Sequence, residues 1–321
     1  MTGFPEPEQT PDGPRYEGRK LDRPDEEVVD QGVAFDITTL MSRRGVLGVL
    51  GLGAVGTFLA ACTPGGGATT ATQSATSSAS ASASASASAS ATASAALPAG
   101  EIPDETVGPY PGDGSNGPDV LEESGIVRQD IRSSIGANDP VDGVPLDFTL
   151  RITDMANGDR AFEGVAVYAW HCNALGEYSL YSSGVEDESW LRGVQVADAN
   201  GQVTFTSIVP GCYSGRWPHI HFEVYPDVSQ IGDSTNAIAT SQMALPQSMV
   251  DQVYASGTYT GSAANLAQIT LDSDNVFGED GGALQLATVS GSASDGYTAS
   301  LVVRVDTTTT PSSGGMGGGR P

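Results

Sequence analysis

The stretch of sequence that decides the fold is Pro210-Gly-Cys-Tyr-Ser-Gly-Arg-Trp-Pro-His-Ile-His-Phe-Glu-Val-Tyr225. It contains two of the three histidines in a chain of 321 residues. Residues two apart on a β-strand point to the same face, so a strand here would project His219 and His221 together and turn Ile220 toward a core. Two neutral imidazoles side by side can hold one metal ion. The stretch therefore predicts a β-strand that carries half of a metal site.

The composition changes along the chain and divides it into a globular part and flanking segments. Residues 1–40 are polar and aperiodic, which predicts a disordered extension. Residues 63–100 include a Ser-Ala repeat and predict a flexible linker, and the Gly-rich residues 307–321 predict a disordered tail. Residues 101–306 remain as a single domain that is long enough to bury a core.

Residues 41–62 have the pattern of an export signal. Arg43 and Arg44 precede a moderately apolar run, as in twin-arginine signals, and the run is short for the alternative, a transmembrane anchor. Leu59-Ala-Ala-Cys62 resembles a bacterial lipobox, which makes Cys62 the expected site of lipidation. We therefore predict an exported protein at the cell surface or outside the cell, held at the membrane only through this lipid. Since such a signal normally starts a chain, Met1 and Met41 are both candidates for the true start.

The charge of the chain excludes one class of partner. The formal net charge is −25, and Lys20 is the only lysine. Nucleic-acid binding requires a basic surface, which this composition does not provide. An acidic surface is instead typical of a soluble, well-solvated exterior.

Alternating apolar and polar residues predict a mostly β domain. The expected strands cover residues 144–153, 162–170, 203–208, 219–225 and 297–305, and turn residues such as Asn157-Gly158 and Asn200-Gly201 separate some of them. Residues 246–256 have the spacing of a helix. We predict an antiparallel β-sandwich with a few short helices and long loops.

Three segments resemble the intradiol ring-cleavage dioxygenases. Trp170-x-x-Asn-x-x-Gly-x-Tyr178 is similar to the segment that carries the first tyrosinate ligand of that family. The opening stretch, with Pro-Gly-x-Tyr before an arginine and His-Ile-His, resembles the segment that carries the second tyrosinate, the arginine and both histidines. Thr106-Val-Gly-Pro-Tyr-Pro111 is similar to the Gly-Pro-Tyr motif near the start of the family's catalytic domains. The resemblance spans most of residues 104–305 and is closest to an exported branch of the family.

The resemblance implies an iron site. The implied ligands of Fe(III) are Tyr178, Tyr213, His219 and His221. Phenolate oxygen suits a hard trivalent cation, and a tyrosine of pKa about 10 is ionised at neutral pH only beside such a charge. Cysteine sulfur would favour softer metals, so neither Cys172 nor Cys212 is assigned as a ligand.

The resemblance also implies a reaction. A catechol-type substrate would be cleaved by O2 between its two hydroxylated carbons to give a muconate-type diacid. Tyr213 would accept catechol protons and Arg216 would stabilise negative charge on the substrate, although the short loop around Arg216 makes its role less direct. Candidate pocket residues are Tyr110, Gln195 and Trp217. The particular catechol and the oligomeric state stay open, with a homodimer as one alternative.

The two cysteines of the domain adjoin the two tyrosine segments. If Tyr178 and Tyr213 bind one iron, Cys172 and Cys212 lie near each other. We therefore predict a disulfide between them, which an exported protein can form, with two free buried thiols as the alternative.

A function of another class fits the same domain. A cell-surface β-sandwich could bind carbohydrate or an aromatic polymer and keep only a vestigial or structural metal. The complete Tyr/Tyr/His/His set favours the enzyme, since a binding module has no need of it. Phenolate-to-iron charge transfer would colour the enzyme red-brown, which makes the two hypotheses easy to separate.

Overall fold

The computed structural model describes residues 97–311 and three short N-terminal strands. These strands, β1 (Glu8–Thr10), β2 (Gly13–Tyr16) and β3 (Arg19–Lys20), pair antiparallel, and the rest of the predicted extension at 1–40 lies outside the described residues. Short hairpins form through local backbone pairing and turn residues, which a low apolar content does not prevent. The predicted signal at 41–62, most of the predicted linker and the tail from residue 312 lie outside the described residues.

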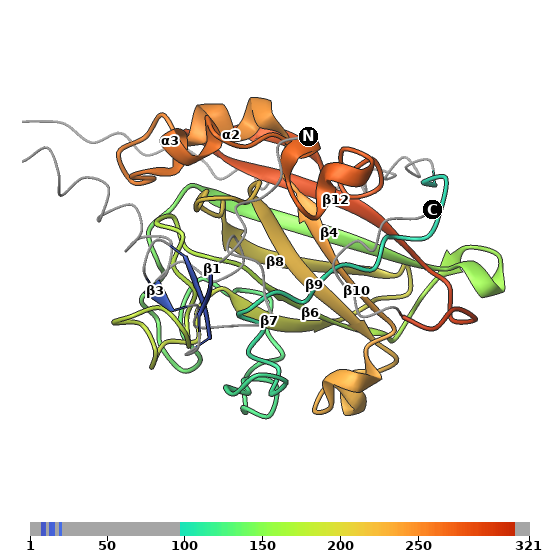
Figure 1. Ribbon diagram of the computed structural model, residues 1–321. Helices are drawn as coiled ribbons and strands as arrows, with labels where there is room; N and C mark the ends of the chain where they lie inside the picture. Colours follow the sequence, from blue (N-terminus) through green and yellow to red (C-terminus); the bar gives the residue numbers. More distant parts are fainter. Residues whose placement is uncertain (1–7, 11–12, 17–18, 21–96, 312–321) are drawn as a thin grey trace, which may run out of the picture.

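Two β-sheets pack face to face (Figure 1). The first has the order β10-β9-β6-β7 and is built from β6 (Ala166–Trp170), β7 (Arg192–Val196), β9 (His219–Tyr225) and β10 (Ala239–Ala244). The second has the order β11-β12-β4-β5, with β8 also paired to β4, and is built from β4 (Pro145–Asp154), β5 (Arg160–Ala161), β8 (Gln202–Ile208), β11 (Thr288–Ser292) and β12 (Gly296–Val305). This architecture confirms the predicted sandwich.

The main core lies between the two sheets. Phe148 of β4 stacks on Phe205 of β8 with ring centroids 5.0 Å apart, and both are fully buried. Ile220 and Phe222 of β9 belong to the same buried cluster. Since side chains alternate along a strand, this arrangement turns His219 and His221 to the outer face of the first sheet.

A second, smaller buried cluster covers that outer face. It includes Tyr168 and Trp170 of β6, Val194 of β7 and Tyr178 from the loop that follows β6. Every residue of β9 is therefore buried, including those on its outer face. The histidine pair is enclosed by the loops on this side of the sheet.

Within the described residues, helices are few and short. The predicted helix at 246–256 is α2 (Gln247–Val253), and α3 (Ser262–Leu266), which was not predicted, lies beside it next to β12 (Figure 1). Five 3-10 turns connect other elements: η2 (Met155–Asn157), η3 (Val228–Gln230), η4 (Ser234–Asn236), η5 (Leu271–Ser273) and η6 (Phe277–Glu279). Within the described part of the chain, no helix has both the length and the apolar character needed to cross a bilayer.

One strand pair of the sandwich is parallel. β12 pairs with β4 in parallel, with Tyr297 opposite Leu146 and Val305 opposite Asp154. Parallel neighbours need a long connection, and here the chain passes through the first sheet and both helices before it returns. Alternation within a strand does not indicate the direction of its neighbour.

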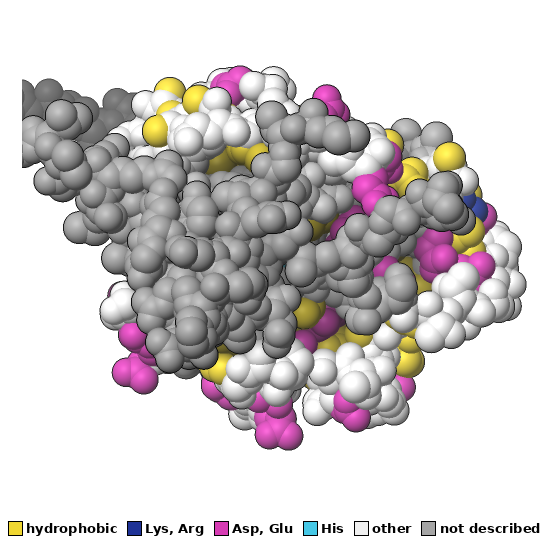
Figure 2. Space-filling view, in the orientation of Figure 1, with side chains coloured by type: hydrophobic (Ala, Val, Ile, Leu, Met, Phe, Trp, Pro, Cys, Tyr) yellow, Lys and Arg dark blue, Asp and Glu magenta, His cyan; other side chains and the backbone are white. Residues whose placement is uncertain are grey.

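The visible surface is acidic. Asp and Glu side chains are spread over the described part of the face in Figure 2, where Lys and Arg are scarce. The domain thus keeps the acidic character of the whole chain, whose formal net charge is −25.

Candidate metal centre

Two tyrosines and two histidines meet on the outer face of the first sheet. Nε2 of His219 lies 3.0 Å from Nε2 of His221, and Oη of Tyr213 lies 3.2 Å from Nε2 of His219. The ring of Tyr178 is 6.0 Å from that of Tyr213 and 6.4 Å from that of His221, centroid to centroid, at steep angles to both. All four residues named from the sequence are therefore brought together.

Strand β9 positions both histidines. Directly opposite residues of antiparallel strands point to the same face, and His221 is paired with Trp170 on β6 and Gln242 on β10. The indole of Trp170 stacks on the His221 ring, with centroids 4.8 Å apart and planes 10° apart. This stacking fixes the plane of the imidazole.

A tight turn after β6 positions Tyr178. The side-chain oxygen of Asn173 accepts hydrogen bonds from the backbone of Leu175 and Glu177, both at 2.9 Å, and the backbone of Asn173 accepts one from Gly176. Asn favours such turns because its side chain can bond to nearby backbone. Gly176 has a φ of +84°, a backbone conformation that residues other than glycine rarely adopt. These requirements explain the Asn-x-x-Gly-x-Tyr spacing.

The two tyrosine segments pack backbone to backbone. A Cβ on Gly176 would lie 3.1 Å from Cβ of Tyr213, and one on Gly211 would lie only 2.6 Å from the carbonyl oxygen of Ala174. The Gly211 N–H also donates to the carbonyl of Asn173 at 3.0 Å. The glycines of the two motifs therefore stand where the segments touch, and the contact sets the separation of the two phenols.

The Gly-Pro-Tyr segment closes the cluster from a third side. A Cβ on Gly108, whose φ is +76°, would lie 3.1 Å from Cε1 of His221. The ring of Tyr110 lies 4.9 Å from that of Tyr178. The structure thus places the predicted pocket residue Tyr110 at the site.

Arg192, which was not singled out from the sequence, ties this segment to the Tyr178 turn. Its buried guanidinium donates hydrogen bonds to the carbonyls of Tyr110, Pro111 and Ser179 and to the hydroxyls of Tyr168 and Ser179. These bonds join three segments that are distant in sequence. Its role could not be read from the sequence, because its burial and its bonds to Tyr110, Pro111 and Ser179 arise only in the folded chain.

His219 has a defined tautomer. Its Nδ1–H donates to the carbonyl of Trp217 at 2.5 Å, which leaves the lone pair on Nε2 facing Tyr213 and His221. Burial and the charge of Arg216 hold the pKa of His219 well below its usual range, so the ring is neutral at pH 7. An imidazole anchored through Nδ1 with a free Nε2 lone pair is the usual state of a metal ligand.

The remaining donor atoms also fit a metal ion. Among the described residues, Oη of Tyr178 is buried without a hydrogen bond of normal geometry, and Nε2 of His221 lies 3.0 Å from Nε2 of His219. Burial, reinforced by the neighbouring Tyr213, raises the pKa of Tyr178 well above 10, so this phenol ionises only beside a strong positive charge. The described residues contain no cluster of three or more His, Cys, Asp or Glu side chains suited to a metal, so any metal here depends on the phenols.

Arg216 is buried beside the cluster. Its Nη2 donates to Oε1 of Gln242 at 2.7 Å, and its Nε donates to Oδ2 of Asp274 at 3.1 Å. Burial lowers the pKa values of His219 and His221, and the charge of Arg216 lowers them further. The same charge partly opposes the rise that burial causes in the pKa of Tyr178. Gln242 and Asp274 were not predicted as site residues, because their contacts with Arg216 join segments that are distant in sequence.

Two predicted pocket residues lie elsewhere. Gln195 pairs with Val167, whose side chain faces the core between the sheets, so Gln195 is on the face opposite the histidines. Its amide donates to the carbonyl of Val194. Trp217 is 2 % exposed in the main core, and its indole N–H donates to the carbonyl of Leu245. The structure therefore places the side chains of Gln195 and Trp217 away from the phenol–imidazole cluster.

The predicted disulfide is absent from the described domain. Cys172 and Cys212 are both free and buried. The thiol of Cys172 points to the carbonyl of Gly211, whereas that of Cys212 points to the carbonyls of Tyr213 and Arg216. The two residues are neighbours, as expected from the tyrosine segments, but their thiols are directed to different acceptors.

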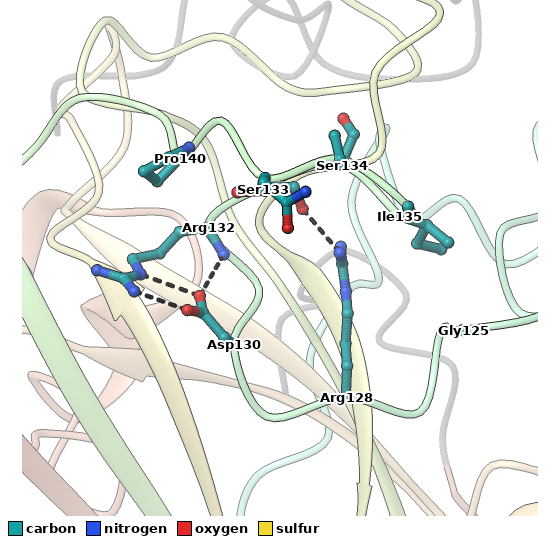
Figure 3. Close-up of a pocket in the computed structure, with 11 residues that line it drawn as sticks. Gly125, Arg128, Asp130, Arg132, Ser133, Ser134, Ile135 and Pro140 are labelled. Carbon is teal, nitrogen blue, oxygen red and sulfur yellow. Dashed lines mark hydrogen bonds and ion pairs between the residues drawn. The ribbon is translucent and has the colours of Figure 1, made fainter.

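A separate cavity of about 360 Å³ is lined by the loop of residues 125–140 (Figure 3). Two arginines give it a basic appearance. Arg132 forms a bidentate pair with Asp130, and Arg128 donates to the carbonyl of Ser133 and to two other backbone carbonyls. Both guanidiniums hold the loop together, so we assign no ligand to this cavity.

The fold and the cluster together define the class of this protein as a β-sandwich with a candidate metal site of two tyrosines and two histidines. We compared the chain with protein families and with solved structures. The dioxygenase family model matches residues 116–229, which contain the whole cluster. No curated protein matches the chain.

Two solved structures share the fold. An intradiol ring-cleavage dioxygenase from Tetranychus urticae has a TM-score of 0.53 and 24% identity, over 66% of this chain and 97% of that one. A second dioxygenase has a TM-score of 0.53 and 22% identity, over 67% of this chain and 98% of that one. The family match and the fold confirm the resemblance to the intradiol ring-cleavage dioxygenases.

Proposed function

We propose that the protein is a non-haem Fe(III) intradiol dioxygenase that uses O2 to cleave a catechol-type ring between its two hydroxylated carbons. The product would be a muconate-type diacid. The observation that carries this proposal is the convergence of two phenol oxygens and two imidazole nitrogens in one enclosed cluster. The family match, which covers this cluster, supports the same reaction class.

The cluster would hold the iron through Tyr178, Tyr213, His219 and His221. When bound there, Fe(III) would keep the phenols ionised and activate a chelated catecholate toward O2. Two phenolates leave one positive charge on the site, and the neutral imidazoles add none. A catecholate dianion would leave the site neutral only if Tyr213 took up a proton, because the dianion and the one remaining phenolate would then offset the three positive charges of Fe(III).

Tyr213 is suited to accept a proton from the substrate. It is half-buried, whereas Tyr178 is 1 % exposed. Its Oη lies 3.2 Å from Nε2 of His219, so this phenol lies beside one of the proposed ligand nitrogens. We therefore assign Tyr178 as the fixed phenol and Tyr213 as the phenol that exchanges protons with the catechol.

Arg216 would stabilise negative charge on the substrate. Its guanidinium is buried and held by two acceptors, so it does not need to reorient when charge develops. Its electrostatic effect on Tyr178, His219 and His221 is consistent with a location beside the reacting centre. The short loop between Tyr213 and His219 is sufficient to place it there.

Export remains part of the proposal. The twin-arginine pattern and the lipobox-like Cys62 support a domain tethered outside the cytoplasm through the 63–100 linker. Twin-arginine transport carries folded proteins, which would allow iron to be loaded before export. Labelling with a radioactive fatty acid, compared with a Cys62→Ala variant, tests the lipid anchor.

The function is tested on the purified chain expressed in iron-replete medium. We expect about one iron per chain, a red-brown colour, and O2 uptake with at least one member of a panel of catechol, protocatechuate, hydroxyquinol and substituted catechols. A colourless protein without iron would contradict the proposal and would favour the binding-module alternative. Zinc in place of iron would also count against oxygen chemistry.

A further inference from the structure

We infer that Asp274 is a positioning residue whose carboxylate holds the Arg216 guanidinium in the orientation used for ring cleavage. This inference rests on the proposed function, in which Arg216 stabilises charge on the substrate. Asp274 comes from the segment between η5 and η6, far along the chain from the motifs. No motif in the sequence points to it.

Backbone groups of two segments fix the carboxylate. Asp274 is 2 % exposed and accepts hydrogen bonds from the N–H groups of Trp217 at 2.6 Å, Val276 at 2.9 Å and Phe277 at 3.1 Å. A carboxylate held by three backbone donors has little freedom to move. It is therefore a rigid support for a longer side chain.

That support determines where Arg216 points. Nε of Arg216 donates to Oδ2 of Asp274 at 3.1 Å, and Nη2 approaches Oδ1 at 3.4 Å while donating to Gln242 at 2.7 Å. Acceptors on two sides of a planar guanidinium fix both its position and its plane. Without Asp274, the guanidinium would lose its acceptor at Nε, and the side chain would regain rotamer freedom.

The same segment also reaches the metal cluster. The ring of Phe277 packs edge-on against His219, with centroids 6.4 Å apart. Asp274 binds both the Arg216 side chain and the backbone of Trp217, two residues before His219. Arg216 and His219 are thus located by one short segment, which links the charge-stabilising group to the ligand set.

The ion pair is poorly explained as a stabilising device. Both side chains are almost completely buried, and burying two charges costs about as much as their attraction returns. Although burial raises the pKa of Asp274, Arg216 and the Trp217 N–H lower it by more, so the carboxylate is ionised. The ion pair is better explained by its effect on Arg216, whose guanidinium it holds in one orientation.

The test compares Asp274→Asn with the wild type and with Asp272→Asn, an exposed carboxylate two residues away. We expect Asp274→Asn to lower kcat at least about tenfold, the usual minimum effect of losing a group that orients a functional residue, while KM for catechol changes less than about threefold. The iron content and the phenolate-to-iron absorption band should not change. Asp272→Asn should match the wild type in every measurement.

A double-mutant cycle separates positioning from mere stability. In an Arg216→Gln background, adding Asp274→Asn should not lower kcat further, because the group that Asp274 orients is already gone. In the metal-free protein, Asp274→Asn should lower Tm less in the Arg216→Gln background than in the wild type. This difference in Tm reports the interaction between Asp274 and Arg216 independently of enzyme activity. The double variant lacks both charges and remains informative if Asp274→Asn alone does not fold.

Each result has a distinct meaning. A folded Asp274→Asn protein with unchanged kcat would overturn the inference, and so would an equal loss of kcat with and without Arg216. An iron-loaded wild type that is inactive on all catechols would instead refute the proposed function. The two failures are therefore distinguishable.

Discussion

The Nε2 atoms of His219 and His221 face each other at 3.0 Å, in the interior of a domain whose only other histidine is His171. Since Nδ1–H of His219 donates to Trp217, the Nε2 lone pair of His219 points into the cluster. A proton on His221, the Tyr213 hydroxyl at 3.2 Å or a metal ion can satisfy that lone pair. Only a metal would also use the phenol of Tyr178.

Loss of either histidine should remove the metal. We expect His219→Ala and His221→Ala to lower the iron content at least about tenfold, since even the loss of a group that supports a ligand costs this much affinity. His171→Gln is the matched control, because His171 is equally buried but bonds to Ser207 and to the Cys172 carbonyl. Elemental analysis decides the matter, and equal iron in all three variants would show that the pair is not a ligand set.

Tyr178→Phe should stabilise the metal-free protein. Its buried hydroxyl, with no normal hydrogen bond among the described residues, costs about 1–3 kcal/mol, so its removal should raise the free energy of unfolding by about 1 kcal/mol. Tyr254→Phe should lower it by about 1 kcal/mol, because the Tyr254 hydroxyl donates to the Pro210 carbonyl at 2.8 Å. Urea denaturation of both variants measures the difference. A destabilised Tyr178→Phe protein would mean that the hydroxyl has a partner without metal.

Stability should depend on pH through His171. Burial is the main cause that lowers its pKa from 6.5 to about 4. The unfolded chain therefore binds a proton near pH 6 that the folded chain does not, so this contribution to stability is full above about pH 6.5 and is lost as the pH falls toward 4. Between about pH 6 and 5, the free energy of unfolding of His171→Gln should fall less steeply than that of the wild type, by about 1 kcal/mol per pH unit. Identical slopes would show that His171 does not contribute.

The two cysteines should react as thiols. Burial raises the pKa of the Cys172 thiol and raises that of Cys212 to about 12, so both should resist alkylation in the native protein. After unfolding without reductant, mass spectrometry should find both alkylated. If the two cysteines were alkylated only after reduction, they would be joined by the disulfide that the sequence predicted.

Local patterns predicted much of the fold. The strand expected at 219–225 is β9, with the same bounds, because its alternation is complete and its neighbours are turn residues. The strand expected from Phe162 starts only at Ala166, after Gly164, whose φ of +88° interrupts extended backbone. β10 was not predicted because Ala239–Ala244 has no clear alternation of apolar and polar residues.

Some residues of the candidate site could also be predicted from local patterns, and others could not. Tyr178, Tyr213 and the histidines were found because each stands in a short motif, and the motif glycines mark where the segments touch. Gln195 lies on the opposite face of its strand, which a segment similarity does not reveal because neighbouring side chains on a strand point to opposite faces. Gln242 and Asp274 escaped prediction because they meet Arg216 from 26 and 58 residues away, a relationship that only the folded chain creates.

The most direct test of the central claim is the reaction of the iron-loaded protein with catechol under 18O-labelled O2, followed by mass spectrometry of the product. We predict a ring-opened muconate-type diacid that carries two labelled oxygen atoms. Unchanged catechol, a quinone without added oxygen, or a product cleaved outside the two hydroxylated carbons would contradict the account.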